Sequence, residues 1–148
     1  MQPKQRKLNY GWSSWLILVL AFITVFFHRL SVGSVADELT KEISMNAVAL
    51  SNLTAMNYYA YALMQIPVGV LVDRIGVRRI NFCGLLVTAA GSVLFGLAHN
   101  LETAYLSRFL VGMGSSVIFV SIFKVQATWF PLSRFSTLSS LTSLFGNL

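Results

Sequence analysis

Long apolar runs separated by short polar segments dominate this sequence. A membrane-spanning helix needs about 20 mostly apolar residues, because the hydrocarbon core is about 30 Å thick and a helix rises about 1.5 Å per residue. Four runs reach this length, and a fifth begins near Ser136 and continues to Leu148. The four runs cover residues 12–34, 47–72, 80–98 and 103–129.

The segments between the runs are short, so successive helices are expected to be antiparallel neighbours. The pattern predicts an all-α membrane protein with four complete transmembrane helices and a truncated fifth, in one domain over residues 1–148. Residues 1–11 form a basic tail ahead of the first helix. The alternative is a stand-alone small four-helix membrane protein, an accessory or assembly subunit without transport activity.

Composition supports a membrane location, and the distribution of charge indicates the orientation of the chain across the membrane. Hydrophobic residues make up 55% of the chain and charged residues 11%, which is too little polar surface for a water-soluble globule. The net charge of +6 does not form a basic stripe interleaved with aromatics, so we expect no nucleic-acid partner but a lipid bilayer. Lysine and arginine gather on the amino-terminal side, which predicts a cytoplasmic amino terminus and a multi-pass protein of the plasma (inner) membrane. The basic residues on that side are Lys4, Arg6, Lys7, Arg74, Arg78, Arg79 and Arg134, whereas Lys41 lies on the other side.

The sequence lacks the motifs that mark several kinds of chemistry. There is no phosphate-binding GxxxxGK[ST] loop, no helical HExxH and no nucleophile elbow. We therefore expect no enzyme, no cofactor and no metal, and an ion gradient rather than ATP as the driving force. Cys83 is the single cysteine, and its apolar neighbours predict a buried thiol.

The loop between the second and third runs carries a distinctive pattern. Gly69 is expected to permit close contact between helices, and Gly76 a tight reversal of the chain. Asp73 would lie at the carboxyl end of a helix, where a carboxylate opposes the helix dipole. It therefore needs a compensating partner, such as Arg74, Arg78 or the amino terminus of a neighbouring helix.

Residues 69–79, which read Gly-Val-Leu-Val-Asp-Arg-Ile-Gly-Val-Arg-Arg, resemble the loop signature of the major facilitator superfamily, GxLxDRxG followed by basic residues. Residues 108–114 are similar to that family's RxxxGxG pattern. The resemblance covers essentially the whole chain. It implies an incomplete amino-terminal six-helix bundle of a secondary active transporter, partnered by carboxyl-terminal helices that are missing here. It also implies a conformational-gating loop made of Gly69, Asp73, Arg74, Gly76, Arg78 and Arg79.

Two arginines fall inside predicted spans, where a charged side chain is costly unless it faces a partner or a water-filled cavity. Arg29 lies near the outer end of the first span and Arg108 near the outer start of the fourth, so they are expected at similar depth and able to share one anion. Residues 27–33 resemble the first-helix motif of organic-anion carriers of the superfamily, although His28 replaces their acid. Histidine titrates near neutral pH, which makes His28 the candidate for proton coupling. The alternative is an outer-interface pair, with Arg29 reaching the headgroups.

Polar residues of the second span recur at helical spacing. Thr54, Tyr58, Tyr61 and Gln65 share one helix face, which we expect to line the cavity rather than meet lipid. Tyrosine packing between helices is the alternative. Lys124 points away from the Arg108 face and is expected to reach the headgroups. Together these features predict ion-coupled symport of a small, anionic organic solute by alternating access, with the 148-residue piece inactive alone.

Overall fold

The computed structural model describes residues 3–42 and 45–146, and within them it is entirely helical, without a strand. The predicted all-α class is therefore confirmed. The helices are α1 (Pro3–Ser34), α2 (Ala36–Glu42), α3 (Ala47–Ile75), α4 (Val77–Gly96), α5 (Leu101–Trp129) and α6 (Leu132–Gly146).

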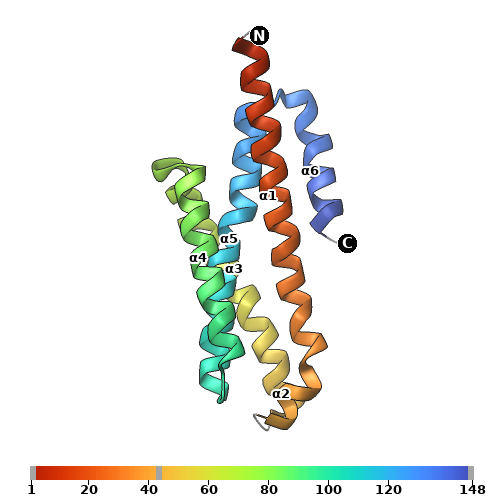
Figure 1. Cartoon of the computed structure of the whole chain (residues 1–148), viewed down its shortest axis with the longest axis vertical. Helices are drawn as coiled ribbons and strands as arrows, with labels where there is room; N and C mark the ends of the chain where they lie inside the picture. The colour runs from red at the N-terminus through yellow and green to blue at the C-terminus, as the bar shows by residue number, and fades with distance from the viewer. Residues whose placement is uncertain (1–2, 43–44, 147–148) are drawn as a thin grey trace.

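The long helices alternate in direction, as the short connections predicted (Figure 1). The amino-terminal end of α1, the turn from α3 to α4 and the turn from α5 to α6 lie at one end of the bundle. Short helix α2 and the α4–α5 connection lie at the other. The basic residues Arg74, Arg78, Arg79 and Arg134 therefore share the end where the chain starts.

Helix α5 forms the centre of the bundle and packs against α1, α3, α4 and α6. Its contact with α4 depends on glycine. A methyl group at Gly84 would lie 2.9 Å from the main-chain oxygen of Gly114, and one at Gly91 would lie 2.9 Å from that of Ser107. The two helix backbones therefore touch, which is how membrane helices associate where water provides no driving force.

Helix α6 is attached to α5 through a buried polar contact. Gln126 is fully buried; its Nε2 donates to Thr142 Oγ1 at 2.9 Å, and its Oε1 accepts from Ser139 Oγ at 3.0 Å. Aromatic packing of Phe123 against Phe135 adds to this contact.

Large apolar side chains cover the outside of the bundle, as expected for a protein dissolved in lipid. Leu16, Leu20, Phe27, Leu63 and Ile66 are all more than half exposed. Among the residues that the structure describes, three helices are suited by length and composition to cross a membrane, over Tyr10–Ser34, Val77–Gly96 and Leu101–Trp129. Helix α3 has 29 residues but is interrupted by asparagines, tyrosines and a glutamine, so it lacks the apolar composition of the other three.

The boundaries differ from the predicted ones at four main places. Helix α1 begins at Pro3, so the predicted tail ahead of the first helix is wrong for residues 3–11, which are helical. Residues 36–42, expected in a loop, form α2, whose Asp37, Glu38 and Lys41 match the helix dipole. Asn100 caps α5 by accepting from the Thr103 amide at 2.8 Å, which starts that helix at Leu101. Helix α6 begins directly after Pro131 rather than near residue 136.

Candidate functional site

Arg29 on α1 and Arg108 on α5 line the same small cavity. Because the two helices run in opposite directions, residues near the end of one and the start of the other meet at one level of the bundle. The cavity has a volume of about 10 Å³, close to the size of one water molecule. Its walls are Arg29, Val32, Thr54, Asn57, Tyr58 and Arg108.

Aromatic rings surround the guanidinium of Arg29. Its Cζ lies 4.6 Å from the ring centroid of Tyr61, 5.1 Å from that of Tyr58 and 5.4 Å from that of Phe26. These distances are within the range of cation–π attraction. The Nε and Nη2 atoms of Arg29 are buried and have no hydrogen-bond partner among the described residues. The rings therefore hold the cation in place while its donors stay available.

Arg108 is more deeply buried, with 3% of its surface exposed. Its Cζ lies 3.7 Å above the ring centroid of Phe95, and its Nη1 donates to the main-chain oxygen of His28 at 3.1 Å. Its Nε has no partner among the described residues. The contact with His28 ties the guanidinium of α5 to the α1 residue that precedes Arg29.

Neither guanidinium is neutralised within the part of the chain that the structure describes. The ion pair found there joins Lys124 and Asp73 and lies toward the other end of the bundle. A half-buried and a buried guanidinium, each with N–H groups that lack a partner among the described residues, have the donor chemistry to bind an anion, most strongly a carboxylate.

The predicted polar face of α3 divides into two parts. Thr54 and Tyr58 line the cavity, whereas Tyr61 contributes its ring to Arg29 from outside the lining. Gln65 is half-buried and lies outside the lining, and its Nε2 has no partner among the described residues.

Asn57 also lines the cavity, and sequence reasoning missed it. It belongs to the buried stripe of α3 with Leu53 and Ala60, not to the face marked by the tyrosines. A polar residue within an apolar stripe at helical spacing is the signal that would have revealed it.

The loop after α3 contains one confirmed geometry and two corrections. Gly76 has φ +91°, a conformation that favours glycine, and makes the predicted tight reversal. Gly69 does not mediate helix contact, because a methyl group there would meet nothing within 4 Å. Asp73 pairs with Lys124 at 2.7 Å rather than with Arg74 or Arg78, and Lys124 is therefore not simply a headgroup-seeking lysine. The sequence placed these two residues in separate helices and gave no register between them.

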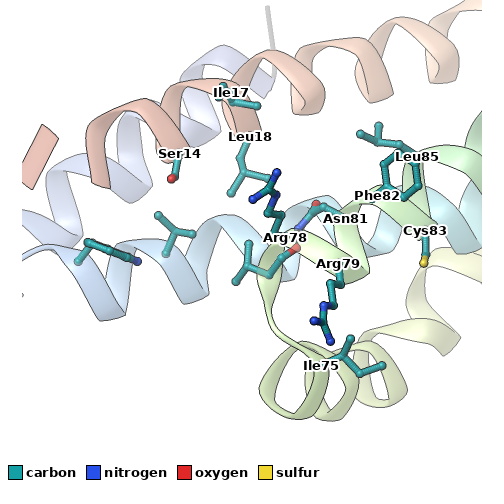
Figure 2. Close-up of a pocket in the computed structure, with 13 residues that line it drawn as sticks. Ser14, Ile17, Leu18, Ile75, Arg78, Arg79, Asn81, Phe82, Cys83 and Leu85 are labelled. Carbon is teal, nitrogen blue, oxygen red and sulfur yellow. Dashed lines mark hydrogen bonds between the residues drawn. The ribbon is translucent and has the colours of Figure 1, made fainter. Parts of the chain in front are cut away.

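Arg78 and Arg79 border a second, larger groove of about 1170 Å³. It lies between α1, the start of α4 and the end of α5. Figure 2 shows Arg78 directed toward Leu18 on α1 and Arg79 toward Ile75. Cys83 also borders this groove and is exposed, so the predicted buried thiol is wrong: Cys83 faces outward from α4, whereas the adjacent Gly84 packs on α5. The groove lies at the end opposite the paired arginines.

An apolar exterior and helices of membrane length define an integral membrane protein, and two unneutralised arginines line one of its cavities. The chain belongs to the Major Facilitator Superfamily, whose family model matches residues 15–148. The resemblance seen in the sequence motifs is thereby confirmed.

Similar proteins include several transporters. The chain is 30% identical over 144 residues to the uncharacterized transporter YybO of Bacillus subtilis (strain 168), covering 95% of this chain and 33% of that protein. It is 29% identical over 136 residues to the probable galactarate/D-glucarate transporter GarP of Escherichia coli (strain K12), covering 86% and 31%. It is 30% identical over 133 residues to the probable anion transporter 7 of Oryza sativa subsp. japonica, covering 87% and 30%. The chain thus spans about a third of the length of these curated relatives. No solved structure matches it.

Proposed function

We propose that this chain is the anion-binding part of a longer carrier that moves a small organic anion across the plasma (inner) membrane. The observation that supports this most is the shared cavity of Arg29 and Arg108, whose free N–H groups have no neutralising carboxylate among the described residues. The names of the relatives agree, since they include a probable galactarate/D-glucarate transporter, a probable sulfoacetate transporter and a probable anion transporter.

The proposed mechanism is ion-coupled alternating access, in which this bundle rocks against a second one around the bound anion. His28 is the proposed proton carrier, because histidine titrates near neutral pH and this residue precedes Arg29 and accepts a hydrogen bond from Arg108 through its main-chain oxygen. Protonation of His28 would add a cation near the site and strengthen anion binding. The loop with Asp73, Arg74, Gly76, Arg78 and Arg79 is proposed to gate the conformations.

The proposed orientation has the amino terminus in the cytoplasm. It rests on the excess of arginine at the bundle end where α1 starts and α3 meets α4. The relatives are about three times as long, so we expect transport to require further helices and the 148-residue chain to be inactive by itself.

The test is uptake of radiolabelled organic anions into proteoliposomes that contain the protein expressed from its complete reading frame. We expect Arg29→Ala and Arg108→Ala each to reduce uptake at least 10-fold, because each removes a charged donor that costs about 1.5–3 kcal/mol of binding. Lys41→Ala, an exposed lysine of α2, is the matched control and should transport normally.

Normal uptake by both arginine variants would exclude this anion site. No uptake of any anion by the unaltered protein would favour the alternative of an accessory membrane protein.

A further inference from the structure

Asn57 is a polar side chain in a place where the fold alone does not explain it. It is 5% exposed and lies in the apolar stripe of α3, between Leu53 and Ala60, where the helix packs on α5. Its main-chain oxygen abuts the position of Gly112, so the asparagine is held close to α5 by backbone contact. An apolar residue would fill the same stripe without the cost of burying an amide.

The side-chain oxygen of Asn57 is buried and has no hydrogen-bond donor among the described residues. Leaving a buried acceptor unsatisfied costs about 1–3 kcal/mol. The same residue lines the cavity together with Arg29 and Arg108, each of which has unpaired donors among the described residues. The lining therefore combines cationic donors with neutral polar groups, and the Asn57 oxygen is the buried neutral acceptor there that lacks a donor.

A ligand that satisfies these groups needs two kinds of atom. The guanidinium groups only donate hydrogen bonds, so they need acceptors, and an anionic acceptor such as a carboxylate binds them most strongly. The Asn57 oxygen only accepts, so it requires an O–H or N–H donor next to that carboxylate. An ammonium donor would be repelled by two guanidinium charges, whereas a hydroxyl would not.

We propose that Asn57 is the specificity-determining residue that accepts a hydrogen bond from a substrate hydroxyl, so that the carrier prefers hydroxycarboxylates over the corresponding plain or amino acids. This inference rests on the proposed anion site and adds to it the chemistry of the neighbouring group.

The test is equilibrium binding to the purified protein expressed from its complete reading frame. The probes are glutarate, α-hydroxyglutarate and glutamate, which differ in one substituent, together with the six-carbon pair adipate and D-glucarate. In the unaltered protein we expect the hydroxylated acid of each pair to bind about 3- to 10-fold more tightly, as for one neutral hydrogen bond, and glutamate to bind most weakly.

In Asn57→Ala the preference for the hydroxylated acid should fall to about one, with circular dichroism used to check that the variant is folded. Asn52→Ala, an exposed asparagine on the same helix, is the matched control and should keep the preference. In Asn57→Asp the added negative charge should lower the binding affinity for every one of the acids.

The outcomes separate the two claims. If Asn57→Ala is less stable but keeps the preference, Asn57 is a packing residue and the inference is overturned while the anion site stands. If the unaltered protein binds the plain and hydroxylated acids equally, the inference is likewise overturned. If it binds none of the acids, or if Arg29→Ala binds them all unchanged, the proposed anion site itself is overturned.

Discussion

Replacement of Gly114 by alanine tests whether α4 and α5 are joined by backbone contact. A methyl group there would overlap the main-chain oxygen of Gly84 and both the main-chain nitrogen and the hydroxyl of Thr88. Main-chain atoms cannot rotate away as a flexible side chain can, so the helices must separate. Overpacking of this kind costs about 1–3 kcal/mol.

The glycine-to-alanine change also favours a helix by up to about 1 kcal/mol, and this gain has to be removed from the comparison. Gly69→Ala supplies the correction, because Gly69 is inside α3 and a methyl group there meets nothing within 4 Å. The gain is common to both variants, so their difference in unfolding free energy measures the overpacking alone. We expect Gly114→Ala to be less stable than Gly69→Ala by about 1–3 kcal/mol.

The assay is equilibrium unfolding in dodecyl maltoside micelles with a rising mole fraction of dodecyl sulfate, followed by circular dichroism. Equal stability of the two variants would refute the close α4–α5 contact. A more stable Gly114→Ala variant would do so even more clearly.

Three further predictions concern the remaining polar and turn features. Gln126→Leu should speed amide hydrogen exchange in α6 about 10-fold or more and leave exchange in α4 unchanged. The reason is that it removes both hydrogen bonds to α6, which together contribute about 1–3 kcal/mol. Equal protection of α6 in the variant and the unaltered protein would contradict this attachment. Gly76→Ala should destabilise by about 1–3 kcal/mol because φ is +91°, whereas Gly96→Ala, with nothing within 4 Å, should not, which micelle unfolding can check. A double-mutant cycle on Asp73→Ala and Lys124→Ala should give a coupling below about 1 kcal/mol, because the side chains are 62% and 46% exposed; a coupling above that would mean the pair is shielded from solvent.

Hydropathy predicted the helices well because membrane length and apolar composition are properties of each segment alone. It placed α3, α4 and α5 with errors of a few residues, some of them at caps such as Asn100, where one hydrogen bond decides the start. It began the first span at residue 12, whereas α1 begins at Pro3, because the polar residues before the apolar run are also helical. It missed α2 because a short polar helix has no apolar run to mark it.

The convergence of Arg29 and Arg108 was predictable because it depends only on the direction of two helices and a position along each. The partner of Asp73 was not, since it depends on the rotation of α5 relative to α3, which the sequence does not specify. Asn57 was missed for a related reason. Helical periodicity identifies faces that carry several polar residues, and Asn57 is one polar residue on the apolar face of α3.

The glycines of α5 also determine which parts of the bundle can move. Gly112 and Gly114 bring α5 into backbone contact with α3 and α4, whereas α1 meets α5 through side chains such as Phe22 against Phe119. Helices packed through rotatable side chains can slide past one another in small steps, but interlocked backbones cannot. We therefore expect α3, α4 and α5 to travel as one rigid body while α1 shifts across it. Arg29 would move with α1 and Arg108 would stay with α5, so the separation of the two guanidinium groups would measure how far the bundle has opened.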